Sequence, residues 1–287
     1  MSILEEKYVL NNGIKIPKLG FGTWLINNTE VVGAVQQAAQ LGYRLFDTAQ
    51  AYGNEVGVGE GLKATGLPRE QFFVTTKVEA NYKDYQTVKN SIDTSLTKLD
   101  LDYLDLLLIH APEPWAEFHG SNHYFAENLA VWQAMEEAVQ AGKVRSIGVS
   151  NFEQVDLDNI LQNCTIKPVV NQLLTHIGNT NFKLIDYSQK KGLLVEAYSP
   201  IAHGEMMKNE QLIKLAKKYQ VSIPQLAIRY CLELGTVPLP KSRTLKHIAA
   251  NRNVNFTIAL EDMQLLKAIP HIKDYGSSSK FPVFSGK

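Results

Sequence analysis

Eight short apolar runs alternate with helical segments along this chain, and this alternation restricts the fold more than any other feature. The runs cover residues 19–23, 44–47, 72–78, 104–110, 145–150, 169–173, 194–199 and 237–240. Between them, segments such as 29–41, 85–99, 126–141 and 181–191 place apolar residues at helical spacing. Eight strand-then-helix units predict a closed parallel barrel, the (β/α)8 or TIM barrel, rather than an open sheet.

The two ends of the chain carry additions to this barrel. Asn11-Asn12-Gly13 separates two short apolar runs, which predicts an N-terminal β-hairpin that acts as a lid. A turn-rich segment begins at Asp274 and is predicted to be a tail over the barrel mouth. Two helical stretches, 208–219 and 222–234, lie between the last two strands. No linker-like segment divides the chain, so residues 1–287 are predicted to form a single domain.

Charge and cysteine content exclude several classes of partner. Twenty-nine basic residues balance twenty-nine acidic ones, so a nucleic acid is not expected as a ligand. No apolar run approaches the length of a membrane span, and the first residues do not resemble a signal peptide. Cys164 and Cys231 form neither a disulfide framework nor a metal motif. We therefore expect a cytoplasmic protein without a metal, and without a heptad pattern a monomer is favoured.

Four polar residues stand at or just after three successive predicted strands. Asp47 ends the second strand and Tyr52 follows it by five residues, Lys77 ends the third, and His110 ends the fourth. In a barrel, the carboxyl ends of the strands carry the active site, so these side chains are predicted to converge. Any one of them alone is more often structural than catalytic. Four together, in order, favour a catalytic site.

This arrangement resembles the catalytic tetrad of the aldo-keto reductase family, in which the same four residue types occur in the same order. The resemblance extends from about residue 10 to residue 284. It implies NADPH-dependent reduction of aldehydes or ketones to alcohols, with Tyr52 as proton donor and His110 orienting the carbonyl. A free tyrosine has a pKa of about 10, and we expect the Lys77 ammonium to lower that of Tyr52 while Asp47 holds the lysine charged.

Two other activities are compatible with parts of the pattern. A lysine at a barrel mouth can form a Schiff base, but that chemistry needs a depressed lysine pKa, which a partnered Asp47 opposes. A barrel could also bind nicotinamide nucleotide as a regulatory sensor or subunit with little turnover, as channel-associated relatives of the family do. The four residues together disfavour this second alternative without excluding it.

The resemblance also implies a set of cofactor-binding residues. Ser150 and Asn151, with Gln172 beside them, would bond the nicotinamide carboxamide, and Tyr198 would stack on its ring. Lys241, Ser242 and Arg243 supply cationic and hydroxyl groups for a 2′-phosphate, which favours NADPH while NADH stays possible. The remaining implied cofactor residues are Gly22, Thr23, Trp24, Ser199, Pro200, His247 and Asn251. His247 stands where the family usually has an arginine.

The predicted substrate pocket departs from the family at two positions. Where many members carry tryptophan, this chain has Glu79 two residues after the lysine and Ala111 directly after the histidine. Trp24 and Trp115 remain as aromatic walls. We therefore expect a wider and more polar opening, suited to a bulky or hydroxylated carbonyl compound as the small-molecule substrate.

Two weaker patterns are assigned structural roles. Gly57, Gly59 and Gly61 lack the spacing of a dinucleotide-binding loop and are predicted to pack inside a helix that Asn54 caps. His119 and His123 have a spacing that could chelate a metal on a helix, but Gly120, Ser121 and Asn122 between them indicate a loop.

Overall fold

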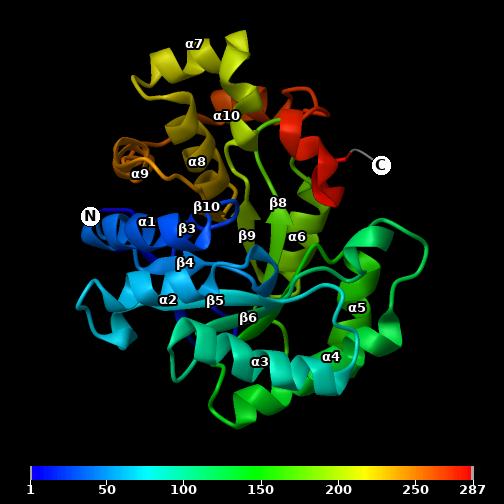
Figure 1. Ribbon diagram of the computed structural model, residues 1–287. Helices are drawn as coiled ribbons and strands as arrows, with labels where there is room; N and C mark the ends of the chain where they lie inside the picture. Colours follow the sequence, from blue (N-terminus) through cyan, green and yellow to red (C-terminus); the bar gives the residue numbers. More distant parts are fainter. Residues whose placement is uncertain (1, 286–287) are drawn as a thin grey trace.

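The computed structural model describes residues 2–285, in which eight parallel strands form the predicted barrel (Figure 1). Each strand pairs with the next one along the chain, and the Gly22 amide donates to the Pro240 carbonyl oxygen at 3.1 Å across the last seam. The strands are β3 (Gly20–Gly22), β4 (Leu45–Asp47), β5 (Phe73–Val78), β6 (Leu106–Ile109), β7 (Ile147–Ser150), β8 (Val170–Leu174), β9 (Leu194–Tyr198) and β10 (Val237–Leu239).

Helices surround the strands on the outside (Figure 1). Side-chain caps define several of their ends: Asn27 accepts hydrogen bonds from the first turn of α1, and Ser222 and Gln225 form a capping box on α8. Among the described helices, none combines the length and apolar character needed to cross a membrane. Their bounds are α1 (Asn28–Gln40), α2 (Glu55–Lys63), α3 (Tyr85–Leu99), α4 (Phe125–Gln140), α5 (Gln154–Asn163), α6 (Phe182–Lys190), α7 (Glu210–Lys218), α8 (Ile223–Glu233), α9 (Leu245–Asn251) and α10 (Leu260–Lys267).

The predicted N-terminal hairpin closes the bottom of the barrel. It consists of β1 (Lys7–Val9) and β2 (Lys15–Pro17), which pair antiparallel. Buried Leu10 and Ile16 pack with the inward-facing residues at the amino ends of the strands, such as Leu45 and Phe73. The hairpin therefore plugs the end opposite the predicted active site, and the mouth is left to other segments.

Helix α2 packs closely against its neighbours because its glycines have no side chain. A Cβ atom at Gly57 would lie 2.0 Å from the Asn28 carbonyl oxygen, and one at Gly59 would lie 2.2 Å from the carbonyl oxygen of Leu99. The predicted packing role of these glycines is confirmed. Asn54 occupies the N-cap position of α2, as predicted, but its side chain does not bond the first turn of the helix, because its Nδ2 donates to the carbonyl oxygens of Thr23 and Ile26.

The C-terminal segment lies over the mouth of the barrel, as predicted. It contains two short 3-10 helices, η5 (Gly276–Lys280) and η6 (Pro282–Phe284), drawn in red in Figure 1. Phe281 and Phe284 contact the Trp24 ring, with ring centroids 4.8 and 5.8 Å away. The tail is therefore held by aromatic packing against the loop that follows β3.

Candidate active site

The four predicted catalytic residues meet at the carboxyl end of the barrel. Lys77 is fully buried, and its Nζ lies 2.7 and 2.8 Å from the two carboxylate oxygens of Asp47. The same Nζ donates to the Thr48 carbonyl oxygen at 2.8 Å and lies 3.5 Å from the Tyr52 hydroxyl. The rings of Tyr52 and His110 form an edge contact with centroids 5.6 Å apart. The convergence expected from strand order is therefore present.

The expected lowering of the Tyr52 pKa is wrong. Burial raises the pKa of Tyr52 well above its usual range, and the negative charge of Asp47 adds to the increase. The charge of Lys77, which also donates at short range to both carboxylate oxygens of Asp47, does not outweigh this burial. Tyr52 is therefore held in its protonated form, which is the form that can donate a proton.

His110 is held as a neutral imidazole. Burial lowers its pKa well below the usual value, and the positive charge of Lys77 lowers it further. The Nδ1 atom is buried without a hydrogen-bond partner among the described residues. An N–H group there would be unsatisfied, so the proton is better placed on Nε2. The ring lines the cavity described below and can donate a hydrogen bond into it.

A second set of polar side chains from β7, β8 and β9 stands next to the tetrad. Asn151 donates to the His110 carbonyl oxygen at 3.0 Å and accepts from the Tyr198 hydroxyl at 2.7 Å. Ser150 Oγ donates to the Gln172 carbonyl oxygen at 3.0 Å. Asn151 adopts a left-handed backbone conformation with φ of 61°, which turns its side chain back toward the mouth. Ser150, Asn151, Gln172 and Tyr198 line the same cavity as Tyr52 and His110.

This cavity has a volume of about 300 Å³ and mostly aromatic walls. Trp24 and Trp115 line it, as predicted, together with Phe281 and Phe284 from the tail. A neighbouring cavity of about 540 Å³ shares Phe284 and Tyr198 with it. We call Trp24, Trp115, Phe281 and Phe284 the aromatic rim.

Two residues predicted to shape the substrate pocket lie elsewhere. Ala111 is fully buried and is not among the residues that line the cavity. Glu79 borders a separate surface hollow beside Gln50 and Glu55. The Gln50 side-chain oxygen accepts a hydrogen bond from the Glu79 backbone amide at 2.9 Å. The expectation of a wide and polar opening at these positions is therefore not supported by the geometry.

A groove of about 270 Å³ runs beside the tetrad. It extends from Asp47 and Tyr52 past Gly22 to Lys241, and it is also lined by Trp24, Ser199 and Pro200. Partial burial, with the nearby charge of Arg243, lowers the pKa of Lys241. A group with several negative charges would relieve that cost. Thr23 does not line the groove, since its hydroxyl donates to the Asp47 carbonyl oxygen at 2.9 Å within the interior.

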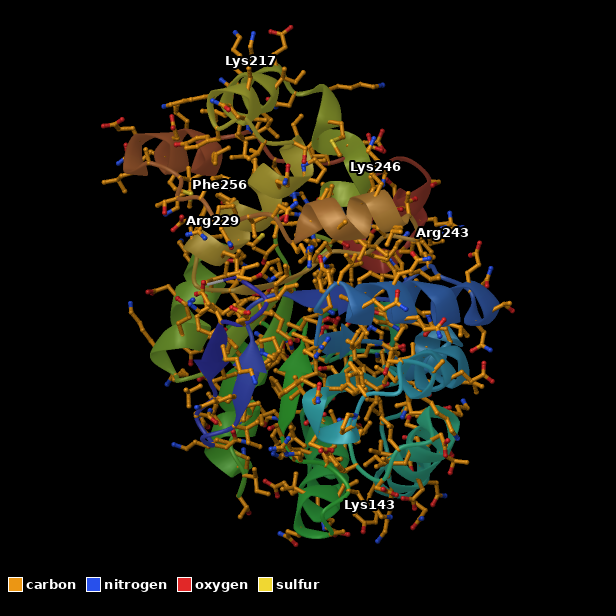
Figure 2. The ribbon with its side chains drawn as sticks, turned by 90° about the vertical axis from the view of Figure 1, so that its left-hand side faces the viewer. Lys143, Lys217, Arg229, Arg243, Lys246 and Phe256 are labelled. Atoms are coloured by element: carbon orange, nitrogen blue, oxygen red, sulfur yellow. The ribbon has the colours of Figure 1, made fainter. Side chains whose placement is uncertain are left out.

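The outer predicted cofactor residues lie beyond the end of this groove. Ser242 and Arg243 follow β10, and His247 and Asn251 are on α9. Figure 2 shows Arg243 and Lys246 at the start of α9 on the outside of the molecule. Arg243 pairs with Glu30 of α1 at 3.2 Å. A cationic surface is therefore present here, although none of these four predicted residues lines the groove.

Three residues of the site are not among those predicted from the sequence: Glu196, His203 and Phe284. The Gln172 amide nitrogen donates to Asp47 at 2.9 Å and to the buried carboxyl group of Glu196 at 2.7 Å. His203 lines the cofactor groove and packs edge-on against Phe284, with centroids 4.7 Å apart. Phe284 itself belongs to the rim. Only Glu196 left a signal in the sequence, because a carboxylate interrupts the apolar run of β9 two residues before Tyr198.

The two histidines of the loop after β6 have different surroundings. His119 and His123 lie in the loop, as predicted, and His123 Nδ1 is 2.8 Å from Asp156. Among the described residues, no cluster of three or more histidine, cysteine or acidic side chains could hold a metal ion.

Comparisons with known proteins agree with this geometry. The model of the aldo/keto reductase family matches residues 18–270. Glyoxal reductase of Bacillus subtilis is 38% identical over 268 residues, covering 93% of each chain. D-galacturonate reductase of Hypocrea jecorina is 37% identical, covering 92% of this chain and 90% of its own. An aldo-keto reductase of Bombyx mori in complex with NADP superposes with a TM-score of 0.85, at 32% identity, covering 97% of this chain and 98% of its own.

Proposed function

The chain belongs to the aldo/keto reductase family, and we propose that it reduces aldehydes and ketones to alcohols with Tyr52 as the proton donor. It is an NAD(P)H-dependent carbonyl reductase, and NADPH is its cofactor. The single observation that carries the proposed mechanism is the contact of the protonated Tyr52 hydroxyl with the Lys77–Asp47 pair, in a cavity that His110 also lines.

Each tetrad residue has one role in this proposal. Bound NADPH supplies the hydride. Tyr52 gives its hydroxyl proton to the carbonyl oxygen as negative charge develops there, while His110 Nε2 donates a hydrogen bond to the same oxygen. Lys77 stabilises the phenolate that Tyr52 becomes, and Asp47 holds the Lys77 ammonium beside the phenol. The groove residue Lys241 would bind a phosphate group of the cofactor.

The Tyr52→Phe substitution tests the proposal. We expect wild-type protein to oxidise NADPH with members of a panel of aldehydes, α-ketoesters and sugar-derived ketones. Tyr52→Phe removes only the hydroxyl, so turnover should fall by about 10²- to 10⁴-fold while NADPH still binds. Absorbance of NADPH measures turnover, and quenching of protein fluorescence measures binding. Wild-type binding without turnover on the whole panel would support the regulatory-subunit interpretation instead.

The state of the protein in the cell is part of the same proposal. We infer that the protein is cytoplasmic, because Cys164 and Cys231 are both free thiols. We also infer that it acts on its small-molecule substrate as a monomer. Light scattering of the purified protein at micromolar concentration would measure the mass, and a dimer would contradict this inference.

A further inference from the structure

Glu196 lies inside the barrel, between apolar core residues and the polar residues of the active site. It is in the middle of β9 and is fully buried. Side chains alternate along a strand, so Glu196 and Tyr198 point inward while Val195 and Ala197 pack outward against the helices. In register with Glu196 on β10 is Val237, also buried and part of the apolar interior. A carboxyl group here costs free energy unless its contacts compensate.

The only hydrogen bond of the Glu196 side chain among the described residues is to the Gln172 side chain. Gln172 Nε2 donates to Glu196 Oε2 at 2.7 Å and to Asp47 Oδ1 at 2.9 Å. An amide nitrogen has two hydrogens, so both are used. Glu196 Oε1 has no hydrogen-bond partner in the described part of the chain. The carboxyl group is therefore only half satisfied, and its one contact is with a residue of the active site.

These two contacts determine which end of the Gln172 amide faces the cavity. Asp47 accepts hydrogen bonds from Lys77 as a carboxylate, so the atom of Gln172 beside it must be a donor. Gln172 lines the cavity, and its Oε1 accepts no hydrogen bond from any described residue. The amide oxygen is thus the group that remains available to a ligand.

Glu196 can accept this hydrogen bond without adding a second negative charge beside Asp47. Burial raises the pKa of Glu196 to about 8, and the charge of Asp47 is the next largest cause. Burial therefore favours the neutral form of the group, whose carbonyl oxygen still accepts from Gln172. A neutral side chain that accepts in the same place should serve equally well.

We propose that Glu196 is a positioning residue, which holds the Gln172 amide together with Asp47 so that its oxygen accepts a hydrogen bond from the carboxamide N–H of the cofactor. This inference rests on the proposed function. Glu196 then contributes to selection of a nicotinamide over a ring that lacks a carboxamide N–H. Without Glu196, one hydrogen of the Gln172 amide has no acceptor, and the side chain can rotate to find one.

The test compares NADPH with its reduced 3-acetylpyridine analogue, in which an acetyl group replaces the carboxamide and no N–H is available. The preference for NADPH is measured in two ways. One is the ratio of the dissociation constants of the two cofactors, obtained by fluorescence quenching, and the other is the ratio of their kcat/KM values. Glu196→Met has similar length and no strong acceptor, and we expect it to reduce the preference for NADPH by about tenfold. Glu196→Gln keeps an acceptor oxygen and should retain the wild-type preference.

Val237→Ala is the matched control, because it alters the barrel interior beside Glu196 without touching the Gln172 amide. It should lower stability and leave the preference unchanged. Glu196→Leu replaces Glu196→Met if the latter does not fold. An unchanged preference in the folded apolar variant, or a loss in Glu196→Gln as large as in Glu196→Met, would overturn the assignment. Dissociation constants need no turnover, so a wild type that binds both cofactors but reduces no carbonyl would refute the proposed function alone.

Discussion

The barrel interior and the aromatic rim hold their side chains in different ways. In the interior, Asp47, Lys77 and Gln172 stand on three strands and are joined by hydrogen bonds of 2.7 to 2.9 Å. In the rim, Trp24 and Phe284 come from a loop and from the tail, and they meet through ring contacts with centroids 5.8 Å apart. Directional bonds between strands fix the positions of the reacting groups. Apolar contacts between loops fix only an approximate surface, which can change without changing the reaction.

The largest effect should come from removing the charge at the centre of the interior. Lys77→Met leaves Asp47 buried and unpaired, so we expect turnover to fall by about 10³-fold and the free energy of unfolding to fall by about 3 to 5 kcal/mol. Steady-state kinetics and denaturant unfolding measure the two losses. Combining Lys77→Met with Asp47→Asn should restore much of the stability and none of the turnover. If Lys77→Met kept turnover within tenfold of wild type, the barrel interior would be no more important for the reaction than the aromatic rim.

Acid should weaken the tail through His176. This fully buried ring lies 3.0 Å from the Tyr275 hydroxyl of the tail, and burial lowers its pKa to about 4. Its unfolded pKa is about 6.5, so the unfolded chain binds more protons in between. The contribution of neutral His176 to the free energy of unfolding is therefore complete above pH 6.5. It is lost as the pH falls through 4, and the loss reaches up to roughly 3 kcal/mol.

The His176→Asn variant provides the comparison for this effect. Asn can hydrogen-bond but does not titrate in this range, so its free energy of unfolding should change less between pH 7 and pH 4. Denaturant unfolding of both proteins at several pH values measures the difference. Parallel pH profiles would show that His176 does not make the tail sensitive to acid.

Phe284→Ala should change substrate binding more than catalysis. Phe284 is 1% exposed and lines both the 300 Å³ cavity and its 540 Å³ neighbour, so its removal should join the two. We expect KM for small aldehydes to rise about tenfold, as buried contact area is lost, while kcat changes less than threefold. The KM for bulky ketones should rise less than the KM for small aldehydes. Leu260→Ala, at a residue 75% exposed, serves as the control. A kcat that fell as far as KM rose would place Phe284 with the interior group.

The smallest effect is expected at Glu79. Glu79→Ala should alter kcat/KM by less than about twofold, because Glu79 borders a hollow that is separate from the cavity. The carbonyl panel used for Tyr52→Phe is sufficient to measure this. A shift in relative kcat/KM between small and bulky substrates would return Glu79 to the substrate pocket.

The sequence predicts the interior far better than the rim, for a physical reason. Strand ends in a parallel barrel share one face, so Asp47, Lys77 and His110 could be placed from local pattern alone. Phe284 reaches Trp24 across most of the chain, and no local pattern specifies such a contact. Ala111 is predicted to line the substrate pocket but is buried, because its exposure depends on how the loop packs. The pKa of Tyr52 was misjudged because burial outweighs Lys77, and burial depends on the whole fold.

Leu10 and Ile16 close the base of the barrel, so the cavity at the active site is open at one end only. Molecules can enter and leave only through the end that the tail overhangs. Under the proposed function, a nicotinamide ring against Gln172 and a carbonyl compound between His110 and Trp115 occupy the same cavity. We therefore expect accumulated alcohol to slow the release of the oxidised cofactor.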